Sequence, residues 1–206
     1  MTPLEELIAR EYFERNGFYF KRLTLNLPAE LPKTKHPISL PPTYLLQRQT
    51  GRTKNQPLED RFQLFSSDIG GLALGTLTII SWQGTGLSLP MFQSFSRYRS
   101  WVRNTIAPVL KFLQSSLQQA SFPAPPLPIV LLPGLPSQDP YRKEIIQILK
   151  ENGIEALFTL RTLLESLIHQ IDTHSLTPDS AISEILRLLK TYDLISPPQL
   201  ELFEDL

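Results

Sequence analysis

Two strand-like segments separated by a glycine turn stand in the first half of this 206-residue chain. The first segment, 62–65, is followed by Asp68 and by the pair Gly70-Gly71, and the second segment, 75–82, is more apolar. Short apolar or alternating runs bounded by turn residues are typical of strands. The sequence therefore predicts two neighbouring strands, with the carboxylate of Asp68 at the end of the first.

Hydrophobic periodicity predicts the other elements. The sequence Thr2-Pro3-Leu4-Glu5 is a capping box with proline at the first helical position, so a helix begins there. The predicted helices span 3–15, 94–119, 141–152, 161–171 and 180–192, and the other predicted strands span 18–25, 129–132 and 156–159. The order is helix, three strands, helix, strand, helix, strand and two helices. This order indicates an α/β fold with parallel strands joined by crossovers.

Composition limits the classes of protein and site. The chain has no cysteine, which excludes disulfides and thiolate metal sites. No uninterrupted apolar stretch approaches the roughly 20 residues of a membrane-spanning helix, and acids and bases interrupt the first residues where a secretory signal would need an apolar run. We therefore expect a soluble, cytoplasmic protein without a membrane partner.

Basic residues are concentrated between residues 31 and 138, where ten lysines and arginines stand against three acids. The formal charge of the whole chain is zero, because the remainder is net acidic. A positive face attracts phosphate backbones, which predicts DNA or RNA as a partner, although the acidic and basic parts could also interleave and cancel. The candidate phosphate contacts are Lys33, Lys35, Arg48, Arg52, Lys54, Arg97, Arg99 and Arg103.

A proline-rich segment at 28–57 lacks a sustained period and is interpreted as a long excursion from the core. A short helix could form within it at 43–49. Its lysines and arginines suit a loop that faces nucleic acid, and a solvated surface loop is the alternative interpretation.

The predicted order resembles the core of the PD-(D/E)xK restriction-endonuclease-like superfamily, an αβββαβ arrangement in which an acid ends the second strand. The resemblance places Asp68 at the metal-binding aspartate. It implies two acids that hold Mg²⁺ and a lysine that positions or activates the attacking water. In this chain Thr78 stands at the position of the second acid, and Ile80 stands at the position of the lysine. The usual catalytic set is thus incomplete.

Two interpretations of this incomplete set remain open. The domain has lost catalysis, or it is an active Mg²⁺-dependent nuclease in which other acids have taken over. For an active enzyme the candidate catalytic residues are Asp68, Glu11 and Glu59, with Asp60 as a further acid and Asp68 as the metal ligand. Asp68 could equally be a turn residue, because aspartate caps turns through its own side chain.

The last ten residues carry a different signal. Two prolines hold the segment extended, and the following residues resemble the Gln-Leu-x-Leu-Phe peptide by which bacterial replication and repair proteins bind the sliding clamp. Apolar side chains would fill a pocket while the glutamine makes polar contacts, or the same side chains pack back on the domain. The candidate partner-binding residues are Gln199, Leu200, Leu202 and Phe203.

The predicted organisation is a nuclease-like α/β core at 1–160, a helical extension at 161–196 and an extended tail at 197–206. We expect a catalytically degenerate nuclease-like protein that binds nucleic acid or acts as an accessory component in DNA metabolism or defence. The alternatives are the active Mg²⁺-dependent nuclease and a non-catalytic subunit that binds other proteins.

Overall fold

Five strands form one mixed sheet in the order β1-β2-β3-β4-β5. The computed structural model describes residues 4–25, 39–49, 62–82, 84–122, 124–171 and 180–195. The strands are β1 (Phe18–Arg22), β2 (Thr43–Arg48), β3 (Leu74–Ile79), β4 (Leu127–Leu132) and β5 (Ala156–Thr159). Strand β2 pairs antiparallel with β1 and β3, whereas β3, β4 and β5 are parallel. The parallel part confirms the crossovers predicted from the alternation of helices and strands.

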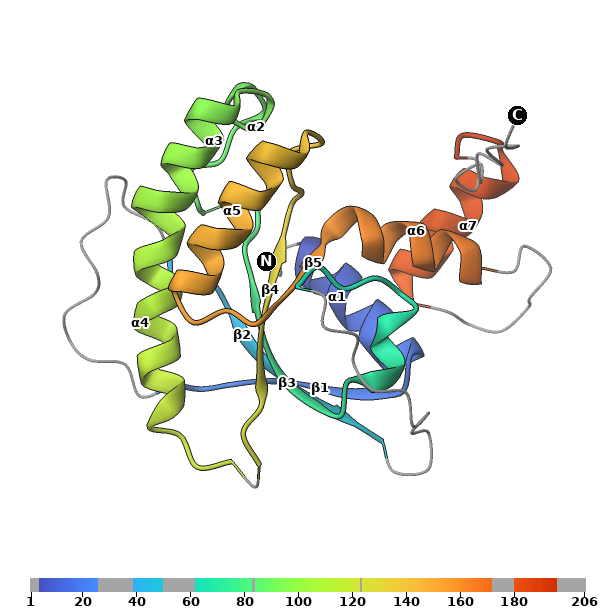
Figure 1. Ribbon diagram of the computed structural model, residues 1–206. Coiled ribbons are helices and arrows are strands. Elements are labelled where there is room, and N and C mark those ends of the chain that lie inside the picture. Colours follow the sequence, from blue (N-terminus) through green and yellow to red (C-terminus); the bar gives the residue numbers. More distant parts are fainter. Residues whose placement is uncertain are drawn as a thin grey trace, which may run out of the picture.

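Helices cover both faces of the sheet (Figure 1). The face that we call the α1 side carries α1 (Leu4–Arg15), α6 (Leu160–Gln170) and α7 (Ala181–Thr191), with the short helix η1 (Asp68–Gly71) beside α1. The other face, the α4 side, carries α2 (Leu89–Gln93), α3 (Phe95–Trp101), η2 (Val102–Ile106), α4 (Ala107–Gln118) and α5 (Asp139–Glu151). No helix of the described residues is long and apolar enough to cross a lipid bilayer.

Aromatic rings form much of the core on the α1 side. The Phe13 ring of α1 meets Phe158 of β5 edge to face at 5.6 Å and Phe18 of β1 at 5.8 Å. Phe20 stacks on Tyr44 of β2 at 4.3 Å. These contacts bury large apolar areas. They attach α1 to both edges of the sheet, because β1 and β5 are its edge strands.

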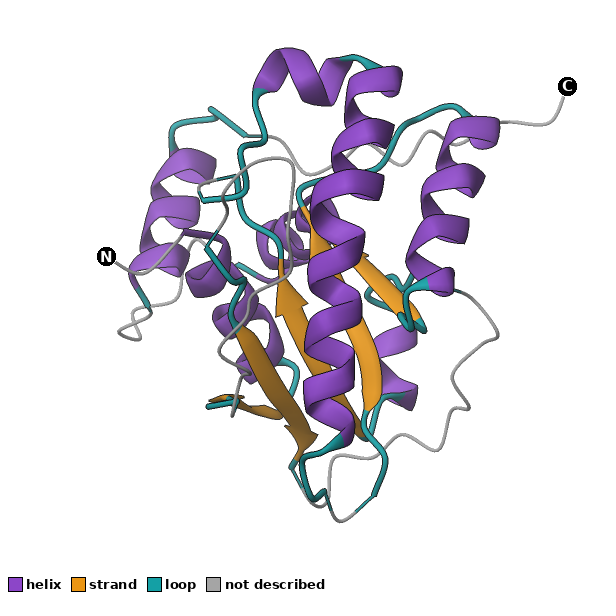
Figure 2. Cartoon of the chain, turned by 90° about the vertical axis from the view of Figure 1, so that its left-hand side faces the viewer, coloured by secondary structure: helices purple, strands orange, loops and turns teal. Residues whose placement is uncertain are grey.

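One long helical segment lies over the α4 side, because α3, η2 and α4 follow one another without a break. Figure 2 shows it in front of the strands. Its middle part, η2, is a π-helix, and Pro108 follows directly in the first turn of α4. Proline has no backbone N–H to donate, and the π-helical turn lies just before this missing donor. The predicted helix at 94–119 therefore exists, and it changes hydrogen-bonding pattern just before the proline.

The prediction of a short helix at 43–49 is wrong, since Thr43–Arg48 is the strand β2. Tyr44 and Leu46 point toward the α1 side and are fully buried there. Hydrogen bonding to a neighbour on each edge, β1 and β3, stabilises an extended conformation that the local pattern does not reveal.

The predicted pairing of 62–65 with 75–82 is also wrong. Residues 62–65 make an isolated parallel bridge with β5, in which Leu64 N–H donates to Leu157 O and Leu157 N–H donates to Phe62 O, both at 2.8 Å. Strand β3 instead lies between β2 and β4. The three strands that follow α1 are thus β1, β2 and β3, and the chain visits the far edge of the sheet between the last two.

Candidate functional site

The end of β3 carries the two positions where the resemblance places a second acid and a lysine. Thr78 is completely buried, and its hydroxyl lies 3.2 Å from the hydroxyl of Thr43 on β2. Ile80 is buried in the apolar cluster of the α4 side. Neither side chain supplies a charge, so what these two positions provide is packing and one hydroxyl pair.

Two carboxylates that sequence reasoning did not single out lie in the first turn of α1. Glu5 and Glu6 are both about 7% exposed. Glu5 Oε1 accepts a hydrogen bond from the Trp82 backbone N–H at 2.9 Å, just beyond β3. Burial, together with the neighbouring charge of Glu6, raises the pKa of Tyr44 well above its usual value. The sequence signal was available, because two adjacent acids interrupt the apolar face of an otherwise amphipathic helix.

Asp68 makes the contacts of a turn residue. Its Oδ2 accepts the Phe65 backbone N–H at 2.7 Å, and its Oδ1 accepts the Ser67 hydroxyl at 3.2 Å. Burial raises the pKa of Tyr12 to about 12, and the nearby charge of Asp68 adds to the rise. Figure 1 shows η1, which begins at Asp68, beside α1 and away from the final residues of β3. The structure therefore does not bring Asp68 together with Thr78.

Glu11 joins α1 to the beginning of α7. Its Oε1 accepts hydrogen bonds from Arg15 Nε at 2.5 Å and from the Ser183 hydroxyl at 2.7 Å. Burial acts to raise the pKa of Glu11, but hydrogen bonds from Ser180, Arg15 and Ser183 outweigh it and hold the pKa below its usual value. A carboxylate held in this way contributes to the packing of two helices.

Arg48, one of the predicted phosphate contacts, is occupied within the fold. Its guanidinium donates to the carbonyls of Leu72, at 2.8 Å, and of Ile69. It also lies over the Phe18 ring, 4.4 Å from the ring centre. Arg48 therefore fastens the segment between η1 and β3 onto the sheet.

The other predicted phosphate contacts within the described residues lie along α3 and η2. Arg97 and Arg103 are exposed, as is Lys111 on α4, and none of the three forms an ion pair with a described residue. Arg99 is half-buried, with its Nε 2.5 Å from Glu144 Oε1 of α5. We call the exposed side chains of Arg97, Arg103 and Lys111, which follow one another along α3, η2 and α4, the basic face.

Several predicted residues lie outside the described part of the chain. They are Glu59, Asp60, Lys33, Lys35, Arg52 and Lys54, together with the tail residues Gln199, Leu200, Leu202 and Phe203. Within the described ranges, no group of three or more histidine, aspartate or glutamate side chains is placed to hold a metal ion.

Of the predicted site residues, Arg97 and Arg103 of the basic face are thus the ones that lie exposed in the described part of the chain. Asp68, Glu11 and Arg48 are engaged in contacts that stabilise the fold. Comparisons of the chain with models of protein families, with curated proteins and with solved structures found no match.

Proposed function

We propose that this protein is a catalytically degenerate, nuclease-like domain that binds nucleic acid through its basic face and acts as an accessory component in DNA metabolism or defence. The observation that carries the proposal is the charge of the α3-η2-α4 segment. The chain contains no acidic residue between Asp68 and Asp139, so the cations of this segment have no acid on their own element.

These cations follow one another along one helical segment. Arg103 comes six residues after Arg97, across the π turn, and Lys111 comes eight residues after Arg103. Exposed lysines and arginines that contact phosphates release counterions, which supplies sequence-independent affinity. A strand of nucleic acid crossing this helix could therefore meet more than one of the three cations.

The order of elements supports the nuclease-like part of the proposal. The helix α1, the strands β1, β2 and β3, the helical segment α3-η2-α4 and the strand β4 follow one another as in the αβββαβ core. The buried Thr78 and Ile80 support degeneracy, because neither can replace a metal-binding acid or a lysine. In this account the retained fold serves as a binding scaffold.

Binding of labelled single- and double-stranded oligonucleotides, followed by fluorescence anisotropy with Mg²⁺ and with chelator, tests the proposal. The variant Arg97→Gln with Arg103→Gln should bind more weakly than the wild type. The matched control, Arg22→Gln with Arg161→Gln, removes two exposed arginines from the α1 side and should bind as the wild type does. Absent binding, or equal losses in both variants, would reject the proposal. Metal-dependent cleavage would show that catalysis remains.

A second candidate function, the protein-binding subunit, is favoured by the outer surface of α7. Ile185 and Leu188 on this helix are more than half exposed, and Tyr192 and Leu194 directly after it are about 70% exposed. Apolar residues gathered on one exposed surface mark sites of protein contact more often than single exposed ones do. The variant Ile185→Ser with Leu188→Ser should lose association with a partner protein, or with a second copy in sedimentation, while retaining its oligonucleotide affinity.

A further inference from the structure

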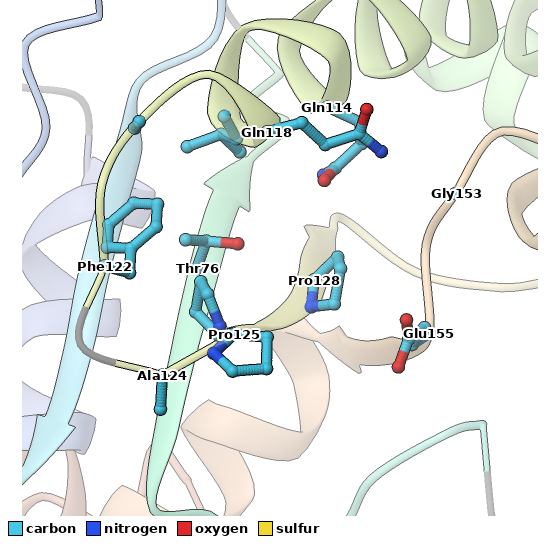
Figure 3. A pocket seen from close by; sticks show the side chains of 12 residues that line it. Thr76, Gln114, Gln118, Phe122, Ala124, Pro125, Pro128, Gly153 and Glu155 are labelled. Carbon is cyan, nitrogen blue, oxygen red and sulfur yellow. The ribbon is translucent and has the colours of Figure 1, made fainter.

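A cavity of about 450 Å³ opens on the α4 side, at the amino ends of the three parallel strands (Figure 3). The last turns of α4, the proline-rich segment before β4 and the turn between α5 and β5 surround it. Its size is in the usual range of small-ligand sites, about 300–1,000 Å³. None of the residues predicted from the sequence as a site residue lines it.

Polar groups enter the cavity from three elements. Figure 3 shows the Gln114 and Gln118 side chains extending from α4 above Thr76 of β3. The Gln114 Nε2 atom is buried and has no hydrogen-bond partner among the described residues. A buried donor without a partner is unfavourable, so a turn of the Gln114 amide toward an acceptor on a bound ligand would relieve it. At the rim, the exposed Glu155 carboxylate can only accept hydrogen bonds.

Flat apolar groups form the remaining walls. Phe122, Pro125 and Pro128 present rings to the cavity. The Gln114 stem packs near Gly153, where an added Cβ would lie 3.6 Å from Gln114 Cγ. A wall of flat rings, with hydrogen-bonding groups nearby, suits a planar heteroaromatic molecule that stacks on it.

We propose that the cavity binds a nucleobase, with guanine as the best match. The edge of guanine carries the O6 acceptor next to two N–H donors, on N1 and on the exocyclic N2. The Gln114 amide would donate to O6, while the Glu155 carboxylate would accept from the two donors. Adenine, cytosine and uracil lack this arrangement of one acceptor beside two adjacent donors, so each leaves the amide or the carboxylate without its partner.

The same base could come from a free nucleotide or from an unpaired position in a strand. Lys111 lies one turn before Gln114 on α4, where side chains three residues apart share a side of the helix. A strand that follows the basic face would therefore bring its phosphates past Lys111 and a base to the cavity. When the base comes from a nucleic-acid strand, the inference rests on the proposed function.

Titration calorimetry with GMP, AMP, CMP and UMP tests the free-nucleotide form on the full chain. GMP should bind, and the others should bind about 10-fold more weakly, the ratio that corresponds to one unmade hydrogen bond of about 1.4 kcal/mol. Gln114→Met keeps the length of the side chain and should lower GMP affinity about 10-fold. The matched control, Gln119→Met, alters an exposed glutamine outside the cavity and should leave GMP affinity unchanged.

Glu155→Gln separates guanine recognition from simple occupancy of the cavity. This variant should lose the preference for GMP over AMP, whereas Glu151→Gln, on the exposed surface of α5, should keep it. Thermal unfolding of each variant checks that the fold is intact. A preference that survives in Glu155→Gln would overturn the assigned edge contacts.

Oligonucleotides with one unpaired guanine or adenine distinguish the two sources. Preferential binding of the guanine strand that is lost in Gln114→Met supports the strand form. GMP binding without oligonucleotide binding supports the cavity and rejects the proposed function. Oligonucleotide binding without base preference, together with no GMP binding, rejects the cavity and leaves the proposed function standing.

Discussion

The two faces of the sheet use the same kinds of side chain for different purposes. On the α1 side, Glu11, Asp68 and Arg48 are held by backbone groups, hydroxyls and rings. On the α4 side, Arg97, Arg103 and Lys111 face solvent, and a cavity contains an unpartnered amide. Acids and bases that point to a site in the sequence can be structural supports. This difference in partners shows structural contacts on the α1 side and is the basis of our proposal that the α4 side binds ligands.

The largest expected difference concerns the aromatic rings. Phe13→Ala on the α1 side should lower the free energy of unfolding by about 3–5 kcal/mol, because the ring is fully buried among other rings. Phe122→Ala at the cavity should lower it by about 1 kcal/mol or less, because this ring is only half-buried. Chemical denaturation measures both. Equal losses would show that the cavity wall is part of the stabilising core.

The next effect concerns Asp68. Asp68→Ala removes the acceptor of the Phe65 N–H and should lower the free energy of unfolding by about 1.5–3 kcal/mol, as for hydrogen bonds to charged groups. Asp68→Asn keeps an oxygen acceptor and should lose less. Unfolding is measured with Mg²⁺ and with chelator, and we expect the same losses in both. A wild-type stabilisation by Mg²⁺ that disappears in Asp68→Ala would make Asp68 a metal ligand.

Replacing Glu11 should have a smaller, pH-dependent effect on the free energy of unfolding. Glu11→Gln should lower the free energy of unfolding by about 1 kcal/mol at neutral pH through weaker bonds to Arg15 and Ser183. The folded pKa of Glu11 lies below its ordinary value of 4.5, so its contribution is present above that pH and is lost as the pH falls through the folded pKa. Wild type and variant should therefore converge in stability under acid. A difference that grows below pH 4.5 would contradict this assignment.

The smallest effect concerns the hydroxyl pair at the end of β3. Thr78→Val leaves the buried Thr43 hydroxyl without its partner and should lower the free energy of unfolding by about 1 kcal/mol. Replacing both threonines by valine should recover most of the lost stability, since two apolar groups of similar shape then meet. A double-mutant cycle by chemical denaturation measures the coupling. An additive loss in the double variant would show that the hydroxyls do not act as a pair.

Much of the fold was predictable because its signals are local. The strand at 156–159 and the long helices follow from apolar runs and periodicity. Strand β2 was not predictable, since its conformation depends on partners 22 to 35 residues away, as in the pairs Arg22 with Tyr44 and Thr43 with Thr78. The segment 62–65 has local strand character, but its bridge to Leu157 spans more than 90 residues. Pairing over such distances leaves no mark in a local window.

The cavity escaped prediction for the same reason. Thr76, Gln114 and Glu155 come from three elements, and no motif connects them. One signal was present, because Gln114 stands next to the buried Leu113 and one turn after Leu110, at the edge of the apolar stripe of α4. A polar residue at that position indicates either a hydrogen bond to the sheet or a water-filled cavity. Only the packed structure distinguishes the two.

The salt dependence of oligonucleotide binding tests the central claim most directly. The logarithm of the binding constant is measured against the logarithm of the salt concentration for wild type and for Arg97→Gln with Arg103→Gln. If both arginines contact phosphates of single-stranded DNA, the slope should become less steep by about 1.4, or about 0.7 for each lost contact. The control Arg22→Gln with Arg161→Gln should keep the wild-type slope. An unchanged slope in the first variant, or an equal change in the control, would contradict binding through the basic face.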